Sequence, residues 1–528
     1  MILLNNVRLS LDTDFSDLRL IAARELKTDW DNISKVTLYR KSVDARKKDD
    51  VHFCCSLLIS VKKSEEKLIN KNKNASSYKK EKYEWKKATV IPKLRPIVMG
   101  FGPAGMFAAL LLARAGLKPI VFERGTDVDT RTKDVEQFFS GGALKENSNV
   151  QFGEGGAGTF SDGKLNTGIK DGRCRTVLET FTRFGADENI LIDAKPHIGT
   201  DVLKKIVKNL REEIISLGGE VHFNSLLNDF IIEDGSLKGI IVNGERVPCD
   251  KLILAIGHSA RDTFEMLKNK SIDMIRKPFS MGVRIEHLQE DINRSLYGDF
   301  SNHKALGAAD YKLAVHLNNG RGVYTFCMCP GGEVVNASSE NGFIAVNGMS
   351  NSRRDGVNAN SAILVNVDPE DLEGDDILAG CELQRHVEKA AFKKGNGAVP
   401  IETVGSFVFG GEQKLGKVKP TVKPCVVFCK LEDIFPEFIT ESLKEGIVLF
   451  DRKIKGFADK DAILTAPETR SSSPIRILRG ENGQALNLKG LFPCGEGAGY
   501  AGGIMSAAVD GIKMAESLMS SYEEAEKP

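Results

Sequence analysis

The sequence lacks a long hydrophobic run, a rich supply of cysteine and an excess of charge of either sign. Its longest uninterrupted apolar stretch, residues 106–113, is far shorter than the ~20 residues that cross a bilayer. Ten cysteines among 528 residues are too few for a disulfide scaffold and fit a reducing compartment. The 73 basic and 72 acidic residues leave a formal net charge of +1, which offers no general attraction to nucleic acid or to an anionic membrane.

The N-terminal segment MILLNNVRLS has no basic start followed by a long apolar core, so it is unlike a signal peptide. Together with the lack of an apolar span, this predicts a cytoplasmic protein without a membrane partner. The hydrophobic content of 41% and the charged content of 27% are typical of a globular chain. Because one domain usually has ~150 residues, a chain of 528 residues is expected to hold several.

The local composition divides the chain into five segments. Residues 1–60 alternate apolar runs with polar turns, which predicts a small α/β module. Residues 61–92 are rich in Lys and poor in aliphatic side chains, and are expected to form a linker or mobile loop. Residues 93–274 and 466–528 carry strand–glycine turn–helix patterns, which predict the two parts of one nucleotide-binding domain. Residues 275–465 have shorter strands and more Gly and Asn, which predicts an inserted β-rich substrate lobe.

A Gly-x-Gly-x-x-Gly pattern at residues 100–105 lies in the context that gives it meaning, since it follows an apolar strand and opens a helix. The second glycine, Gly102, would let the backbone approach a pyrophosphate, which the helix N-terminus would hold. Glu123 ends the next strand, where a carboxylate would bind ribose hydroxyls and favour FAD or NAD over NADP. The cofactor-binding residues expected here are Gly100, Gly102, Pro103, Ala104, Gly105, Glu123 and Arg124.

Three further glycine-containing segments favour FAD over NAD, because a dehydrogenase with a single nucleotide-binding unit needs none of them. The segment NVQFGEGGAGTFSDGKLNT has the composition of a loop that passes close to a flat cofactor. A buried strand ends in Ala-Ile-Gly, and the segment LFPCGEGAGYAGGI places an acid between glycines before a helix. The cofactor-binding residues expected in these segments are Gly155, Gly156, Gly158, Thr159, Phe160, Ser161, Asp162, Lys164, Ala255, Ile256, Gly257, Gly495, Glu496, Gly502, Gly503 and Ile504.

These segments, with TFCMCPGGEVVNASSENGFIAVNGMS and ETRSSSPIRILR, resemble a family of bacterial FAD-dependent dehydrogenases that are usually labelled uncharacterised or NAD(FAD)-utilising. The resemblance extends over nearly the whole chain, including the N-terminal KSVDARKK. It implies non-covalent FAD and a glutathione-reductase-like fold, and it implies no settled substrate. The predicted fold class is therefore α/β, with α+β character overall: a glutathione-reductase-like Rossmann FAD-binding domain, an inserted β-rich lobe and a small N-terminal module.

Four polar residues are candidates for the chemistry. The resemblance brings Lys164 and Arg470 near the cofactor, and Glu286 and His287 follow a predicted strand from which they could act as acid or base. With Arg284, the cations at Lys164 and Arg470 would suit a substrate that carries a carboxylate or a similar anion. Arg470 could instead stabilise the negative charge of reduced flavin, as could the helix N-terminus at Gly502–Gly503.

The cysteines offer little evidence of a redox relay. Cys425 and Cys429 have the C-x4-C spacing of a redox pair, but they lie in an apolar stretch where packing is the better interpretation. Cys327 and Cys329 form a C-x-C pair before a glycine turn, and we expect no electron relay through them because the disulfide would be strained. With only eight His and no zinc-binding spacing, the sequence predicts no metal site.

The function expected from these observations is FAD-dependent oxidation or reduction of a small-molecule substrate, with hydride passing between that substrate and flavin N5. NAD(P)H is a candidate electron donor or acceptor. Two alternatives stay open: a flavoprotein that binds or modifies RNA through its N-terminal module and Lys-rich segment, and a non-catalytic FAD-binding redox sensor. The sequence predicts neither an oligomeric state nor a substrate, and its charge balance makes nucleic acid the less favoured partner.

Overall fold

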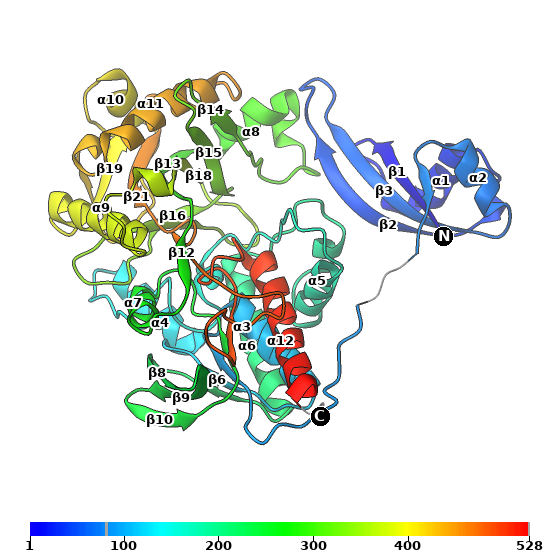
Figure 1. The fold of residues 1–528 in the computed structure, drawn as a ribbon. Helices are drawn as coiled ribbons and strands as arrows, with labels where there is room; N and C mark the ends of the chain where they lie inside the picture. The colour runs from blue at the N-terminus through cyan, green and yellow to red at the C-terminus, as the bar shows by residue number, and fades with distance from the viewer. Residues whose placement is uncertain (80–82, 526–528) are drawn as a thin grey trace.

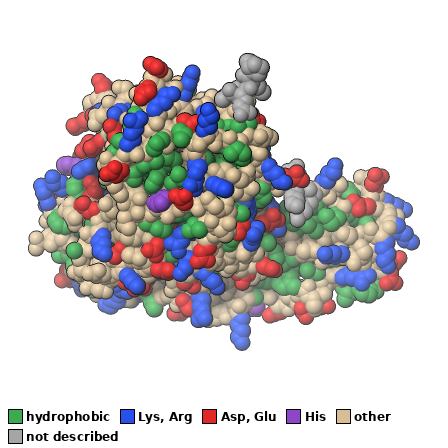
Figure 2. All heavy atoms as spheres, turned by 90° about the horizontal axis from the view of Figure 1, so that it is seen from below, with side chains coloured by type: hydrophobic (Ala, Val, Ile, Leu, Met, Phe, Trp, Pro, Cys, Tyr) green, Lys and Arg blue, Asp and Glu red, His purple; other side chains and the backbone are tan. Residues whose placement is uncertain are grey.

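The computed structural model describes residues 1–79 and 83–525, which form a small N-terminal module and a larger two-part body (Figure 1). The mixed α/β class expected from the sequence is confirmed. Among the described residues, no helix is both long enough and apolar enough to span a membrane. On the face shown in Figure 2, basic and acidic side chains are intermixed, in keeping with the balanced charge of the sequence.

The N-terminal module has a β-α-β-β-α-β order and a four-stranded antiparallel sheet in the order β2-β3-β1-β4, which is the ferredoxin-like arrangement. Its elements are β1 (Ile2–Leu9), α1 (Leu18–Leu26), β2 (Ile33–Asp44), β3 (His52–Val61), α2 (Glu65–Lys71) and β4 (Ala75–Ser77). The linker expected at residues 61–92 therefore begins later than predicted, because α2 and β4 belong to this sheet's own fold. Leu68 of α2 is buried in the module's core and Ile69 packs against it, and two adjacent apolar positions give little helical periodicity to detect.

The parallel-sheet domain contains five parallel strands in the order β23-β11-β5-β6-β7. The strands are β5 (Ile97–Met99), β6 (Ile120–Phe122), β7 (Glu220–His222), β11 (Leu252–Leu254) and β23 (Leu491–Pro493). The helices are α3 (Pro103–Arg114), α4 (Val128–Phe139), α5 (Arg173–Arg183), α6 (Thr200–Ser216), α7 (Arg261–Asn269) and α12 (Ile504–Ala525). A three-stranded antiparallel sheet adds β8 (Leu227–Glu233), β9 (Ser236–Val242) and β10 (Glu245–Pro248). Strands far apart in the sequence, β5 and β23, thus share one sheet.

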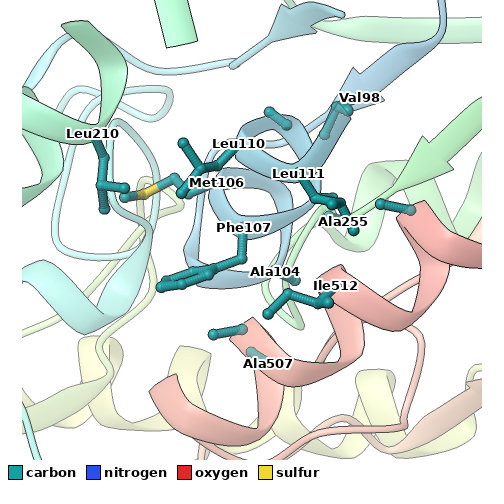
Figure 3. Close-up of a cluster of buried hydrophobic side chains, with 14 of the residues drawn as sticks. Val98, Ala104, Met106, Phe107, Leu110, Leu111, Leu210, Ala255, Ala507 and Ile512 are labelled. Atoms are coloured by element: carbon teal, nitrogen blue, oxygen red, sulfur yellow. The ribbon is translucent and has the colours of Figure 1, made fainter. Parts of the chain in front are cut away.

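Helix α3 is buried on nearly all sides, which explains its continuous apolar sequence. Figure 3 shows Phe107 and Met106 of α3 packed among side chains from α6 and α12, including Leu210 and Ile512. This packing fixes the N-terminus of α3 against the carboxyl ends of β5 and β11, where ligands bind in open parallel sheets.

The lobe is built on a seven-stranded sheet in the order β14-β15-β18-β13-β21-β19-β20, antiparallel except for the β19–β20 pair. Its strands are β13 (Phe279–Leu288), β14 (Ala314–His316), β15 (Gly322–Cys329), β18 (Asn358–Val367), β19 (Val399–Thr403), β20 (Val426–Phe428) and β21 (Ile463–Glu468), with a β16 (Glu333–Asn336) and β17 (Val346–Met349) hairpin beside them. Its helices are α8 (Gln289–Tyr297), α9 (Ala379–Gly395), α10 (Val404–Phe409) and α11 (Glu437–Asp451). Antiparallel pairing of β12 (Met274–Arg276) with β22 (Ile475–Ile477) joins the chain entering the lobe to the chain leaving it.

Candidate active site

A cavity with an empty volume of about 1520 Å³, partly open to solvent, lies between the parallel-sheet domain and the lobe. The parallel-sheet domain lines it with the turn after β5, the loop at residues 151–164, the loop after β11 and the turn before α12. The lobe and the segment that leaves it contribute Phe326, Cys327, Cys329, Asn347, Gly348, Glu468, Arg470 and Ser471. We call the first group the cofactor wall and the second the lobe wall.

The three glycines of the turn after β5 are required for different reasons. A Cβ on Gly100 would lie 2.3 Å from the carbonyl oxygen of Ala255, and one on Gly105 would lie 1.9 Å from the carbonyl oxygen of Gly100. A Cβ on Gly102 would meet nothing closer than Cα of Gly156 at 3.6 Å, so protein packing does not exclude it. Gly102 also precedes the first turn of α3, whose free N–H groups suit an anion. The absence of a side chain at Gly102 is therefore explained by a ligand that approaches the backbone there, rather than by contact with a neighbouring residue.

Glu123, at the end of β6, lines the cavity and is 5% exposed. Its carboxylate accepts hydrogen bonds from the backbone N–H groups of Phe101 at 2.7 Å, Gly125 at 2.9 Å and Gly153 at 3.0 Å. The same carboxylate therefore joins the turn after β5 to the second glycine loop, a role that the sequence did not indicate. An oxygen of a carboxylate can accept two hydrogen bonds, so Oε2, which accepts one from Phe101, can still bind a ribose hydroxyl.

Most of the residues predicted to bind the cofactor line the cavity. They are Gly100, Gly102, Pro103, Ala104, Glu123, Arg124, Gly156, Gly158, Ser161, Asp162, Lys164, Ala255, Ile256, Gly257, Glu496, Gly502, Gly503 and Ile504. Five predicted contacts do not line it: Gly105, Gly155, Thr159, Phe160 and Gly495. Thr159 is turned inward, where its hydroxyl donates to the carbonyl of Glu154 and its carbonyl accepts from the hydroxyl of Thr200 at 2.6 Å. Phe160 is buried beneath the guanidinium of Arg131, so these two side chains support the loop from behind.

The loops after β11 and β23 meet at the cavity and bring together a pair that the sequence did not reveal. Nδ1 of His258 lies 3.3 Å from Oε1 of Glu496. Both residues line the cavity, and Nε2 of His258 has no hydrogen-bond partner among the described residues. The only sequence signal was that His258 directly follows the predicted Ala-Ile-Gly turn. A Cβ on Gly502 or Gly503 would meet no atom within 4 Å, so the N-terminus of α12 is open to the cavity.

Lys164 belongs to the cofactor wall and is paired with Asp162, its Nζ lying 2.7 Å from Oδ2. Arg354 from the lobe binds the same carboxylate, with Nε 2.9 Å from Oδ1. Burial alone would raise the pKa of Asp162, but the two cations hold that pKa well below its ordinary value. Two cations thus share the one carboxylate of Asp162, which leaves a local excess of positive charge at this point.

Arg470 lines the lobe wall, and its charge is already matched by a buried carboxylate. Its Nε lies 3.0 Å from Oε1 of Glu388 and its Nη2 lies 2.9 Å from Oε2. Arg284 lies behind the wall and is fully buried, with Nη1 2.8 Å from Oε2 of Glu468. The two arginines that suggested an anionic substrate are therefore both held in ion pairs by the protein itself.

Glu286 and His287 lie outside the cavity lining, so the geometry does not support the catalytic role predicted for them. Glu286 is buried and accepts hydrogen bonds from Asn358 Nδ2 at 3.0 Å and the Thr421 hydroxyl at 2.6 Å. His287 points to the opposite face of β13, where its Nε2 lies 2.8 Å from the carbonyl oxygen of Phe457. None of the residues that line this cavity belongs to β13, and the position of that strand relative to the cavity depends on tertiary packing that the sequence does not reveal.

Cys327 and Cys329 both line the cavity, so the C-x-C segment is part of the candidate site. A register shift between Phe326 and Cys329 interrupts the pairing of β15 with β18 and turns Cys327 toward the cavity. The side chain of Cys327 is exposed to the cavity, and desolvation by the protein around that cavity raises its pKa to about 12. Burial raises the pKa of Cys329 to about 11. Both are therefore thiols near neutral pH. In the described part of the chain, no group of three or more His, Cys, Asp or Glu side chains is placed to hold a metal ion.

One cavity holds the glycine turn, the carboxylate that follows β6 and two helix N-termini. This combination is typical of dinucleotide-binding flavoproteins. The open space at Gly102 fits the pyrophosphate of FAD. The profile of a family described as "FAD-dependent protein, C-terminal domain-like" matches residues 278–471, and one described as a domain of unknown function matches residues 1–60. A Clostridium beijerinckii protein, described as an uncharacterized protein, is 50% identical over 526 residues, which cover 98% of this chain and 99% of the relative. The chain belongs to the same family as this relative, and its residues 278–471 match the profile of FAD-dependent proteins.

Other similarities are more distant. The FAD-dependent monooxygenase nodY2 of Hypoxylon pulicicidum is 30% identical over 215 residues, which cover 37% of this chain and 43% of that protein. Among solved structures, the flavin-dependent brominase Bmp2 has a TM-score of 0.39 and 11% identity, covering 81% of this chain and 79% of that one. Glycine oxidase from Bacillus cereus has a TM-score of 0.31 and 11% identity, covering 81% of this chain and 96% of that one. The expected dependence on FAD is supported by the family profile that matches residues 278–471.

Proposed function

We propose that the protein is an FAD-dependent dehydrogenase in which hydride passes between a small organic substrate and N5 of the flavin. The observation that carries the proposal is that one cavity has two walls that differ in chemical character. The cofactor wall is made of glycine loops and helix N-termini, whereas the lobe wall presents thiol, amide, carboxyl and guanidinium groups. Binding the flavin against the first wall would leave the second wall to face a substrate.

On the cofactor wall, each group has a distinct proposed part in a glutathione-reductase-like arrangement. The α3 N-terminus at Gly102 would hold the pyrophosphate, and Glu123 would bind the ribose hydroxyls. Glu496 would meet the ribityl chain, with His258 fixing the position of its carboxylate. When bound, FAD supplies the hydride-accepting and hydride-donating chemistry that these side chains lack.

Two positive groups of the chain would face the flavin. The open N-terminus of α12 at Gly503 and the ammonium of Lys164 are both on the cofactor wall. Reduced flavin carries negative charge, which a helix N-terminus or a cation stabilises. Both features support a cofactor that cycles between its oxidised and reduced states, rather than one that is bound only as a structural element.

The test is anaerobic spectroscopy of the purified protein, with free FAD in the same buffer as the control. We expect the flavin to remain bound through gel filtration and its absorbance to bleach with NADH, NADPH or a member of a metabolite library. A yellow protein that no donor in the library reduces, yet that dithionite reduces fully, would contradict the dehydrogenase and favour an FAD-binding redox sensor. A protein that purifies without flavin and takes up none would contradict the cofactor site itself.

A further inference from the structure

One buried carboxylate, Glu388 of α9, binds two arginines that reach it from different parts of the molecule. Arg470 contacts both of its oxygens from the segment that leaves the lobe. Arg261, at the start of α7 in the parallel-sheet domain, also contacts both, with Nη1 2.9 Å from Oε2 and Nη2 2.8 Å from Oε1. Glu388 is fully buried, and it also accepts a hydrogen bond from the hydroxyl of Thr469.

A second acid completes the charge balance of this cluster. Oε1 of Glu340 lies 2.8 Å from Nη1 of Arg261 and 3.6 Å from Nη2 of Arg470. Arg385 reaches the other oxygen of Glu340 at 3.5 Å and Oε1 of Glu265 at 3.9 Å. Three arginines therefore face three glutamates, and the innermost pair of cations is matched by Glu388 and Glu340. Burial would raise the pKa of Glu388, but Arg261 and Arg470 hold that pKa well below its ordinary value, so the carboxylate is charged.

Glu468, the other charged residue of the lobe wall, is also neutralised by an ion pair with a buried partner. Glu468 lines the cavity, and the fully buried Arg284 lies behind it with Nη1 3.0 and 2.8 Å from its two oxygens. The lobe wall is therefore electrically balanced at both of its charged positions. In contrast, Lys164 and Arg354 share the single carboxylate of Asp162 at the loop of residues 151–164, so their positive charge is only partly matched there.

We propose that Glu388 is a specificity-determining residue: together with Glu340 it neutralises Arg470 and Arg261, and it thereby makes the lobe wall accept an uncharged organic substrate in preference to one that carries a carboxylate. The proposal rests on the proposed function, because it assumes that the substrate lies against this wall. The physical reason is that an ion in a partly dry cleft must find an unmatched opposite charge to repay its desolvation. A guanidinium already bound through two nitrogens to a carboxylate cannot provide one.

The test compares two probes of nearly the same shape, benzamide and benzoate, which differ in charge. Their binding to the purified holoprotein is measured by isothermal titration calorimetry. For the unaltered protein we expect tighter binding of benzamide than of benzoate. In Glu388→Gln, one carboxylate charge is removed beside two guanidiniums, and we expect benzoate to bind about tenfold more tightly, or about 1.4 kcal/mol, with little change for benzamide.

Because Glu388→Gln leaves two buried arginines short of one partner charge, it could fail to fold, so a second variant carries the same test. Glu340 is 25% exposed and contacts the same two arginines from the side, so Glu340→Gln is better tolerated and is expected to improve benzoate binding about threefold. The matched control is Glu265→Gln, because Glu265 contacts only the outer Arg385 and is 55% exposed. This control should change neither probe.

The outcomes separate the two proposals. Tighter benzoate than benzamide binding in the unaltered protein, or no gain of benzoate binding in Glu340→Gln and in any folded Glu388→Gln, would overturn the role of Glu388. Failure of both probes to bind the unaltered protein and both variants would overturn it as well. FAD content and bleaching by NADH or NADPH are recorded on the same samples and report separately on the proposed function. A merely structural role for Glu388 would weaken both probes equally and would not give a selective gain for the anion.

Discussion

His258 and Glu496 are separated by more than two hundred residues in the chain, yet Nδ1 of the histidine lies 3.3 Å from a carboxylate oxygen of the glutamate at the cavity. The contact exists because β11 and β23 are parallel neighbours, so the loops that follow them leave the sheet at the same edge. Glu496 alone would have several rotamers available. With His258 beside it, its carboxylate is directed along one wall of the cavity.

We predict that His258→Gln and Glu496→Gln each lower the affinity for FAD by roughly tenfold, about 1.4 kcal/mol, because either change removes the contact that positions a cofactor-binding carboxylate. The fluorescence of added FAD at equilibrium measures this affinity. The double variant should be little weaker than the weaker single variant, since the two residues act as a unit. His222→Gln is the control, because His222 lies on β7 and is absent from the cavity lining. Additive losses in the double variant would show that the pair does not act together.

We predict that Gly102→Val abolishes retention of FAD while the protein still folds. No protein atom lies closer than 3.6 Å to a Cβ at this position, so the new side chain would project into the space where the pyrophosphate is expected. Flavin absorbance near ~450 nm, compared with protein absorbance, measures occupancy. Gly168→Val is the control, since Gly168 is exposed and also has no neighbour within 4 Å. A Gly102→Val protein with full flavin absorbance would contradict the assignment of this turn.

The dinucleotide turn could be predicted because its function is local. Gly100, Gly102 and Gly105 act within one strand–turn–helix unit, and Glu123 ends the next strand, so sequence spacing alone specifies their arrangement. Glu388 gave no such signal. It lies in the middle of α9, and its partners come from α7 and from the segment after β21, so its role depends entirely on how the lobe packs against the sheet.

The catalytic assignments show the same limit. Arg470 was correctly expected near the cavity, but the sequence could not reveal that Glu388 already occupies its guanidinium. Glu286 and His287 have the chemistry of an acid or a base, but neither lines this cavity, and both make hydrogen bonds within the lobe. A side chain's capacity for acid–base chemistry is a property of one residue, whereas its access to a substrate is a property of the tertiary packing.

We predict that Cys327→Ser with Cys329→Ser leaves the rate of flavin reduction within a few-fold of the unaltered protein. Desolvation raises the pKa of Cys327, which faces the cavity, to about 12 and that of the buried Cys329 to about 11, and thiol–disulfide exchange requires the thiolate. Stopped-flow absorbance with the donor found in the anaerobic screen measures the rate. Cys425→Ser is the control, because Cys425 is exposed like Cys327 but does not line the cavity. A loss of ~100-fold, about 2.7 kcal/mol of barrier, would instead reveal a dithiol relay.

The last prediction concerns Glu154, which is fully buried and whose Oε1 has no hydrogen-bond partner among the described residues. Its other oxygen accepts from the N–H of Val128 at 2.7 Å, and Arg211 lies 3.4 Å away. Burial raises the pKa of Glu154 from 4.5 to about 7, which outweighs the lowering by these two neighbours. The folded protein therefore keeps this proton over a range of pH in which the unfolded chain has released it.

Because the unfolded state binds fewer protons between pH 4.5 and about 7, the free energy of unfolding should fall as the pH rises through that range. The contribution of this one group is on the order of 3 kcal/mol. Glu154→Gln cannot ionise, so we expect it to lose less stability than the unaltered protein between about pH 5 and about pH 8, as measured by urea unfolding at both values. Glu136→Gln, at an exposed position on the neighbouring helix α4, is the control and should keep the original pH dependence. An identical fall in stability for the Glu154 and Glu136 variants would show that the buried carboxyl is already ionised throughout this range.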